Sequence, residues 1–161
     1  EAVSRIYQEG IQTKTATFQQ DTPDYEKWDL EHLQDCRFVA VEADSVTKGD
    51  GLDPGVSEVL GWAALTPVST RCVYQGVAEV SVYVANHAKG KGTGKALLVR
   101  LIEASEQVGI WTLQSSIISA NKASIRLHER CGFRLIGYRE RIARDIDGNW
   151  QDIVLMERRA K

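Results

Sequence analysis

Glycine and lysine alternate in the middle of the chain, in a stretch that could bind an anion. Its seven residues are Lys89, Gly90, Lys91, Gly92, Thr93, Gly94 and Lys95. Before it, residues 80–84 alternate as in a strand, and after it, residues 97–108 repeat apolar side chains at helical spacing. A glycine-rich connection from a strand into a helix presents converging N–H groups at the positive end of the helix dipole. The stretch therefore predicts a phosphate site, with a solvated, lysine-rich helix cap as the alternative.

The spacing departs from the two common nucleotide-binding loops. A Walker A loop needs glycine at position 89 and Ser or Thr at position 96, where this chain has Lys89 and Ala96. The dinucleotide pattern GxGxxG can begin at Gly90, but it meets Lys95 in place of its third glycine. ATP, GTP and NAD are therefore disfavoured as ligands.

Composition indicates an ordinary globular domain. The 161 residues are 43% hydrophobic and 26% charged, and 20 basic against 22 acidic residues give a net charge of −2. The length predicts a single domain, residues 1–161, that needs no metal or disulfide for its core. Near neutrality disfavours nucleic acid as a partner, and no apolar run approaches the roughly 20 residues of a membrane span. Cys36, Cys72 and Cys131 are odd in number and far apart, which predicts free thiols and a cytoplasmic location.

Hydrophobic periodicity predicts the elements that must hold the loop. Helices are expected over residues 3–11, 23–33, 95–108 and 122–130, and strands over 38–41, 60–65, 79–84, 112–118, 135–144 and 150–156. Thr22 and Asn121 are expected N-caps, and Gly109 is placed to end a helix. Residues 47–55 are expected to form a long connection. Because the chain opens at helical spacing, an initial strand is expected to precede it. The pattern is that of one mixed α/β domain.

Several segments together resemble the GNAT acetyltransferases. Residues 79–84 followed by 89–94 are similar to motif A of that family, whose consensus is Gln or Arg, two residues, Gly, one residue, and Gly or Ala. Residues 121–133, from Asn-Lys-Ala-Ser through Leu-His to Gly-Phe, are similar to the second cofactor motif. Further matching segments are residues 16–18, 61–63 and 150–156. The ordered set resembles the phosphinothricin acetyltransferase-like branch over nearly the whole chain.

The resemblance implies the GNAT fold, in which a mixed, mostly antiparallel sheet with a central V-shaped split is flanked by helices. It implies acetyl-coenzyme A as the co-substrate, held in that split. The main chain of Val82, Tyr83 and Val84 would pair with the pantetheine arm, and N–H groups of this strand would polarise the thioester carbonyl.

The same resemblance assigns the rest of the cofactor site. The N–H groups from Gly90 to Lys95 would hold the pyrophosphate, and Asn121 and Ser124 would contact the cofactor from the next unit of the fold. Lys89 stands where the family has Arg or Gln. Lysine keeps the charge but lacks the planar fork, so weaker geometry is expected there.

Acetylating an amine requires the neutral nucleophile, and a free amine is mostly protonated at pH 7, so a general base fits the reaction. Glu79 lies in an otherwise apolar strand, opposite its valines, and we expect it to be this base; the alternative is a carboxylate paired with an arginine. The resemblance points to the same residue. His128 stands where many GNAT enzymes have the tyrosine that protonates the thiolate. A packed histidine is the alternative, and Tyr83 and Tyr138 are other candidate donors.

Covalent and metal-dependent routes are disfavoured by the sequence. Cys72 has no recognisable His or Asp partner nearby, and Cys131 belongs to a predicted helix end. The three histidines, His32, His87 and His128, show no metal-ligand spacing, so no metal is expected.

For the acceptor, the branch implies a small amino acid or analogue such as phosphinothricin or methionine sulfone. An α-carboxylate is matched by an arginine fork. Arg71, eight residues before Glu79, is the candidate, with Phe18 as an apolar wall and a solvated loop arginine as the alternative. Other amines (a polyamine, an aminoglycoside or a protein N-terminus) and a non-catalytic acyl-CoA-binding module remain open. The branch also implies a homodimer.

Overall fold

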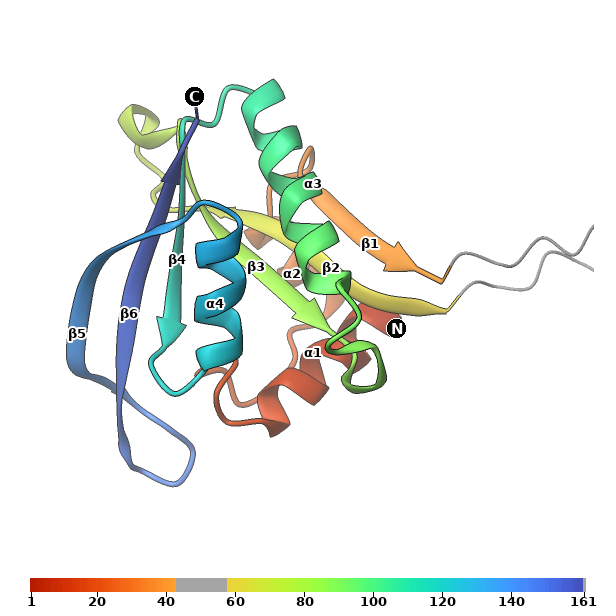
Figure 1. The fold of residues 1–161 in the computed structure, drawn as a ribbon, viewed down its shortest axis with the longest axis vertical. Coiled ribbons are helices and arrows are strands. Elements are labelled where there is room, and N and C mark those ends of the chain that lie inside the picture. Colours follow the sequence, from red (N-terminus) through yellow and green to blue (C-terminus); the bar gives the residue numbers. More distant parts are fainter. Residues whose placement is uncertain (43–57, 161) are drawn as a thin grey trace, which may run out of the picture.

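The computed structural model describes residues 1–42 and 58–160, so the predicted connection over residues 47–55 lies outside the described residues (Figure 1). The helices are α1 (Ala2–Gln12), α2 (Tyr25–Glu31), α3 (Thr93–Gln107) and α4 (Lys122–Arg130), with short 3-10 turns η1 (Cys72–Tyr74) and η2 (Asn86–Ala88). The strands are β1 (Arg37–Val41), β2 (Val59–Pro67), β3 (Val77–Val84), β4 (Thr112–Ile118), β5 (Arg134–Arg144) and β6 (Trp150–Arg159).

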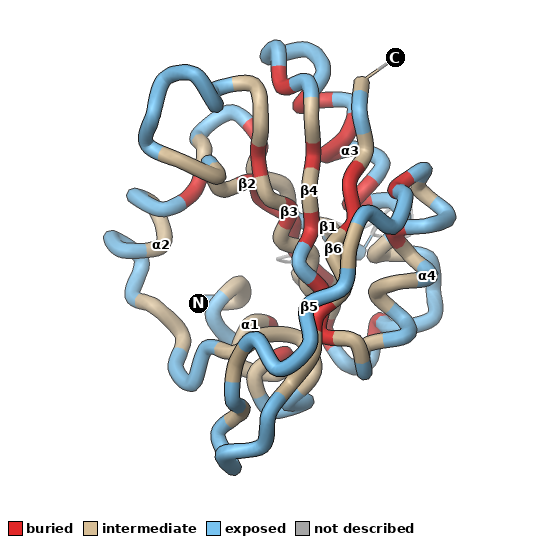
Figure 2. Tube along the Cα trace, turned by 90° about the vertical axis from the view of Figure 1, so that its left-hand side faces the viewer, coloured by how far each residue is buried: buried red, intermediate tan, exposed pale blue. Residues whose placement is uncertain are grey.

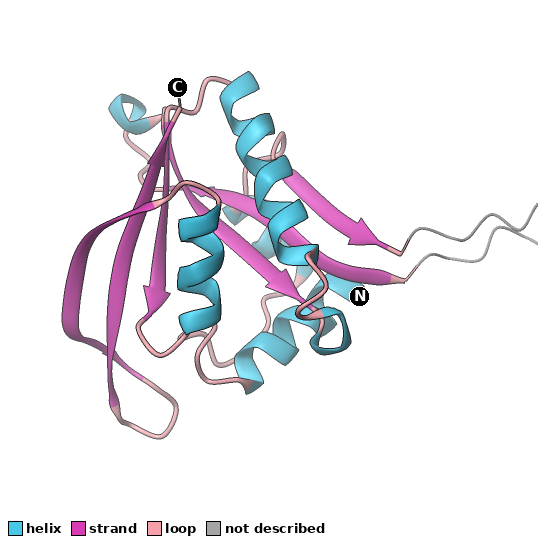
Figure 3. Cartoon of the chain, viewed as in Figure 1, coloured by secondary structure: helices cyan, strands magenta, loops and turns pink. Residues whose placement is uncertain are grey.

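The described strands form one sheet in the order β1-β2-β3-β4-β6-β5. Every neighbouring pair is antiparallel except β3 and β4, which run parallel. These two central strands pair only from Val77–Thr112 to Glu79–Gln114. Beyond that point they diverge, as Figure 3 shows. The predicted mixed sheet with a central split is confirmed.

Helices cover both faces of the sheet because alternate side chains of the central strands point to opposite faces. On the face covered by α3, Leu65 of β2 packs with Leu98 and Leu101 in the larger core cluster. On the other face, Trp62 of β2 packs with Ile6 of α1 in a second cluster. Figure 2 shows α1 and α2 on one side of the strands and α3 and α4 on the other, with β5 largely exposed at the edge. None of the helices in the described ranges is long and apolar enough to cross a lipid bilayer.

Of the three residues predicted to cap or end a helix, two are confirmed and one is corrected. Asn121 caps α4, because its side chain accepts the N–H of Ser124 at 3.1 Å. Gly109 follows α3 with a φ of +81°, which favours glycine. The helix expected to begin after Thr22 instead begins at Tyr25. Its cap is Asp24, whose carboxylate accepts the N–H of Lys27 at 2.8 Å, and aspartate is a stronger cap than threonine.

Candidate functional site

The gap between β3 and β4 exposes unpaired main chain. The N–H of Ala85, directly after β3, donates to the carbonyl of Leu60 in β2 at 2.9 Å. Backbone groups alternate sides along a strand, so the main chain of Tyr83 also faces β2, where it pairs with Trp62. The main chain of Val82 and Val84 faces the opposite way, into the gap, where β4 no longer pairs with β3. Of the three residues expected to pair with the pantetheine arm, only Val82 and Val84 therefore have main-chain groups facing the gap.

Glu79 lies where the two strands part. Its carboxylate accepts the N–H of Ser116 at 3.3 Å and the side-chain amide of Gln114 at 3.5 Å, both from β4. In a continuing parallel ladder, a carbonyl of β3 would accept the Ser116 N–H. The side chain of Glu79 takes over that role, and so the apex of the gap carries a carboxylate.

The loop after β3 forms the expected N–H cradle at the start of α3. Gly90 and Gly92 have φ values of +77° and +89°, a region that side chains other than glycine's rarely adopt. Gly92 caps α3 without a side-chain hydrogen bond. Across the described residues, the first-turn N–H groups of Thr93, Gly94 and Lys95 have no backbone partner. A helix start with open N–H groups favours a phosphate.

Two further contacts complete this cradle. A Cβ on Gly94 would lie 3.3 Å from Leu127 of α4 and 3.4 Å from Val84 of β3, so glycine lets all three elements approach. Lys89 donates its ammonium to the side chain of Asn86 at 2.6 Å, and its charge stays next to the loop. The start of α3 therefore lies against the end of β3 and against α4.

Asn121 and Ser124 are committed to the local structure of α4. Besides its cap, Asn121 donates its side-chain N–H to the carbonyl of Thr15 at 3.2 Å, which ties α4 to the segment after α1. Ser124 uses its N–H in the cap. The structure thus assigns both polar ends of the Asn121 side chain to contacts within the chain.

Replacing Asn121 should separate these contacts. Asn121→Ala removes the cap and the Thr15 contact, and we expect the free energy of unfolding to fall by about 1 kcal/mol, measured by urea denaturation. Asn121→Asp keeps a capping oxygen and loses only the donor to Thr15, so a smaller loss is expected. An unchanged urea midpoint for Asn121→Ala would contradict the structural role.

His128 has the surroundings of a packed histidine, the alternative that the sequence left open. It is buried on α4 against Phe133, with ring centroids 4.9 Å apart, and its Nδ1 donates to the carbonyl of Ser124 at 2.8 Å. Burial lowers its pKa. A neutral ring with the proton on Nδ1 has only a lone pair on Nε2. The structure therefore disfavours His128 as the proton donor at neutral pH.

The two alternative donors are also engaged. Tyr83 stacks on Trp62 with ring centroids 4.8 Å apart, and burial raises the pKa of its hydroxyl. The hydroxyl of Tyr138 donates to the carboxylate of Asp152 on β6. Across the described residues, no group of three or more His, Cys, Asp or Glu side chains is placed to hold a metal ion.

A cavity of about 480 Å³ lies on the α1 and α2 side of β2 and β3. Phe18 lines it, as expected, and Ser81 of β3 forms part of its floor. Ser81 and Glu79 are two residues apart on one strand, so their side chains share this face. Arg71 is not brought to this wall: its guanidinium lies over the ring of Tyr74, 5.7 Å from the centroid, in an exposed loop.

Sequence reasoning missed the aromatic wall of this cavity. Trp28 of α2, His32 directly after that helix, and Trp62 of β2 line it. Their signal was present, because Trp28 and His32 are four residues apart and therefore share one face of a helix. With Glu79 at the apex, the site joins an anion cradle, an open strand edge, a carboxylate and an aromatic cavity.

Comparison with known proteins places this arrangement in a family. Residues 3–133 match the acetyltransferase (GNAT) family. The phosphinothricin N-acetyltransferase of Alcaligenes faecalis is 35% identical over 98% of this chain and 76% of that protein. The L-methionine sulfoximine/L-methionine sulfone acetyltransferase of Pseudomonas paraeruginosa is 37% identical over 62% of this chain and 58% of that protein.

The structural comparison agrees with the sequence comparison. A crystal structure of a phosphinothricin acetyltransferase from Sinorhizobium meliloti, in complex with AcCoA, superposes with a TM-score of 0.79. The two chains are 27% identical, and the match covers 97% of this chain and 80% of the other. Fold, loop and sequence thus lead to one conclusion: this chain belongs to the GNAT family of acetyltransferases.

Proposed function

We propose that this chain transfers an acetyl group from acetyl-CoA directly to the primary amine of a small amino acid or analogue, of the phosphinothricin or methionine sulfone kind. The observation that supports it best is the position of Glu79. Its carboxylate stands at the apex of the gap, on the same face as the aromatic cavity and beside the unpaired main chain of β3. The names of the relatives support the choice of acceptor.

The residues present fit acetyl-CoA. The N–H groups at the start of α3, with Lys89, Lys91 and Lys95 adding positive charge, suit a pyrophosphate. The open main chain of Val82 and Val84 suits the amide groups of a pantetheine arm. Acetyl-CoA supplies the activated thioester. Asn121 and Ser124 are proposed to contact it only secondarily, because their polar groups already bond within α4 and to Thr15.

In the proposed reaction, Glu79 accepts the proton of the acceptor's ammonium, directly or through water, which frees the lone pair for attack. N–H groups of β3 that face the gap donate to the developing oxyanion. As the carbon–sulfur bond breaks, the sulfur leaves as a thiolate, whose ordinary thiol pKa near 8.5 makes it stable, and the amine's remaining extra proton passes to it or to solvent. The reaction therefore needs no strong proton donor, and His128 acts by packing.

A thiol-release assay tests this proposal. Acetyl-CoA is mixed with the protein and one amine at a time: phosphinothricin, methionine sulfone, spermidine, an aminoglycoside and a peptide with a free N-terminus. We expect release well above background with the amino-acid analogues. Preference for another amine would change the acceptor class. Tight binding of acetyl-CoA with no release for any amine would favour the acyl-CoA-binding module.

We propose Arg71 as the partner of the acceptor's carboxylate. It lies outside the cavity wall, in an exposed loop where its guanidinium packs over Tyr74 and forms no ion pair within the described residues, so this role requires the loop to bring it to the acceptor. Arg71→Gln should raise the KM for phosphinothricin about tenfold, the scale of one charge-assisted hydrogen bond, and leave the KM for acetyl-CoA unchanged. Steady-state kinetics at saturating acetyl-CoA measure this effect. Lys27→Gln is the matched comparison, since Lys27 lines the cavity. A larger effect there would identify Lys27 as the partner instead.

A cytoplasmic homodimer is proposed as the working form. Cys36, Cys72 and Cys131 are all free thiols, which suits a reducing compartment. Edge strand β5 exposes Leu135 and Tyr138, which are 63% and 57% exposed, and apolar surface at a sheet edge suits a second copy. Sedimentation analysis would show a mass twice that of the chain.

A further inference from the structure

His32, directly after α2, is held rigidly at the wall of the cavity. It is only 9% exposed. Its ring stacks on Trp28, with centroids 4.2 Å apart and planes 19° apart, and meets Trp62 nearly edge-on at 6.1 Å. Its Nδ1 lies 2.7 Å from the carbonyl oxygen of Trp28. The position of the imidazole is thus fixed by two rings and one hydrogen bond.

That hydrogen bond fixes the position of the ring proton. A carbonyl oxygen only accepts, so Nδ1 of His32 must carry the proton and donate. Burial is the largest influence on the ring and lowers its pKa, which keeps it neutral at pH 7. In a neutral ring with the proton on Nδ1, the Nε2 atom has a lone pair and no hydrogen. His32 can therefore bind only a hydrogen-bond donor through Nε2.

The Nε2 atom of His32 is accessible and free. In the described part of the chain, the enclosed side-chain nitrogens without a partner belong to Trp28, Trp62 and His128, not to His32. Within residues 1–42 and 58–160, Nε2 has no hydrogen-bond partner, and His32 lines the cavity. The lone pair is therefore open to a molecule in the cavity.

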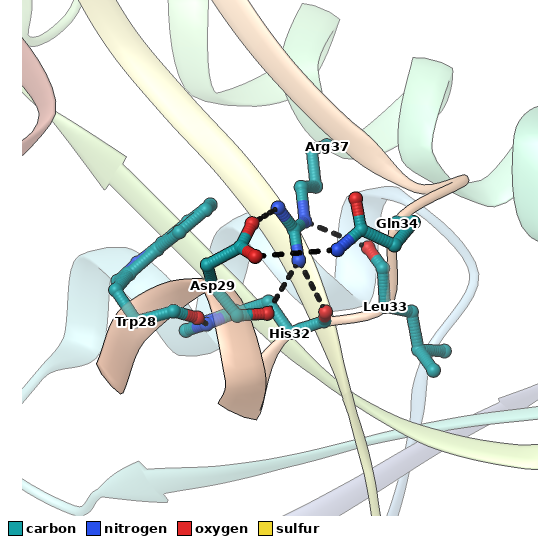
Figure 4. Close-up of polar contacts among 6 residues, drawn as sticks. All are labelled: Trp28, Asp29, His32, Leu33, Gln34 and Arg37. Atoms are coloured by element: carbon teal, nitrogen blue, oxygen red, sulfur yellow. Dashed lines mark hydrogen bonds and ion pairs between the residues drawn. The ribbon is translucent and has the colours of Figure 1, made fainter. Parts of the chain in front are cut away.

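Arg37 of β1 anchors the segment that carries this histidine (Figure 4). Its guanidinium pairs with the carboxylate of Asp29 and donates to the main-chain carbonyls of Asp29, His32 and Leu33. α2 has only seven residues, too few to be stable alone, so this clamp sets its position. Arg37 is thereby a positioning residue for the cavity wall.

Building on the proposed function, we propose that His32 binds the amine of the acceptor, with Nε2 accepting a hydrogen bond from the ammonium group. A zwitterionic amino-acid analogue such as phosphinothricin offers oxygen acceptors at its carboxylate and phosphinate, and its ammonium is its donor. The charged side chains of the surrounding cavity favour a cation. Asp21 and Glu31 line it, against Lys27 as the one basic side chain with a fixed charge on the described wall.

Nitrogen NMR of the full chain, labelled with ¹⁵N-histidine, tests the contact directly. We expect His32 to show the Nδ1-protonated form, and its Nε2 resonance to move when phosphinothricin is added to the protein. N-acetylphosphinothricin keeps a single uncharged amide N–H in place of the ammonium, so it should shift this resonance much less. An equal shift with both compounds, or no shift with phosphinothricin, would overturn the proposal.

Kinetics with three variants complete the test. His32→Phe keeps the stack on Trp28 and removes Nε2, so the KM for phosphinothricin should rise about tenfold with the KM for acetyl-CoA unchanged. His32→Gln can restore an acceptor atom and should recover part of that loss. His87→Gln, at an exposed histidine, is the matched control. A wild-type KM in His32→Phe would overturn the assignment of His32 alone, whereas absence of wild-type turnover would overturn the proposed function as well.

Discussion

Glu79→Gln should lower kcat about 10³-fold, within the range that general-base catalysis contributes, and leave the Kd for acetyl-CoA unchanged. The amide of glutamine keeps an oxygen that can accept the Ser116 N–H, so the apex of the gap should keep its geometry. The variant cannot take up a proton at neutral pH. Loss of rate with retained binding would therefore be a loss of base and not of fold. The rate of thiol release measures kcat, and calorimetric titration with acetyl-CoA measures the Kd.

The pH profile separates this role from a structural one. As pH rises toward the pKa of the acceptor's amine, more of the amine is already neutral, so the need for a base declines. The ratio of wild-type to Glu79→Gln rates should shrink accordingly. Glu103→Gln, at an exposed glutamate on α3 that pairs with Arg100, is the matched control and should behave as wild type. A ratio that stays constant up to high pH, or a Glu79→Gln rate within threefold of wild type, would remove Glu79 from the role of base.

The sequence was sufficient where one local rule decides the structure. Alternation in β3 placed Glu79 opposite the valines, and glycines in the loop after it predicted the N–H cradle. Asn121 followed from its capping preference. Each of these features depends on neighbours within a few residues, so a single sequence exposes them.

Features that depend on contacts between residues far apart in the sequence could not be predicted from local sequence patterns. The start of α2 differs from the predicted one because both Thr22 and Asp24 are residue types that favour the N-cap position, and the structure uses Asp24. The cavity wall needs α2 to be held beside the sheet, which the hydrogen bonds from Arg37 of β1 to the carbonyls of Asp29 and His32 achieve. The environment of His128 depends on Phe133 and on burial, neither of which its position in the motif reveals. The roles of the cavity wall and of His128 therefore depend on tertiary packing, which the sequence pattern does not show.

The two faces of the sheet differ in the kind of ligand that they suit. On the α3 face, open N–H groups and lysines suit an anionic carrier, whereas on the α1 and α2 face, acidic side chains and the lone pair of His32 suit a cation. Glu79 lies at the last pair between β3 and β4, where the gap opens between the two faces. A substitution on the α3 face should therefore weaken the binding of acetyl-CoA and leave acceptor binding unchanged, and a substitution on the other face should do the reverse.

Gly94→Val is expected to raise the Kd for acetyl-CoA about 100-fold, because it should displace the start of α3 and misalign two or more charge-assisted hydrogen bonds to phosphate, each typically strong. A Cβ at this position already meets Leu127 at 3.3 Å and Val84 at 3.4 Å, and two further methyl groups cannot fit between α4 and β3. Titration calorimetry with acetyl-CoA measures the Kd. Binding of phosphinothricin, on the other face, should change little, as His32 resonances would report.

A second glycine provides the matched control for this substitution. Gly137 lies in β5, where a Cβ would meet Leu155 at an ordinary 3.6 Å, far along the sheet from the loop. Gly137→Val should therefore bind acetyl-CoA as wild type does. Thermal unfolding of both variants shows whether the fold survives, because overpacking alone costs about 1–3 kcal/mol. If a folded Gly94→Val bound acetyl-CoA with wild-type affinity, the first turn of α3 would not be the phosphate site, and the assignment of the gap to the pantetheine arm would lose its anchor.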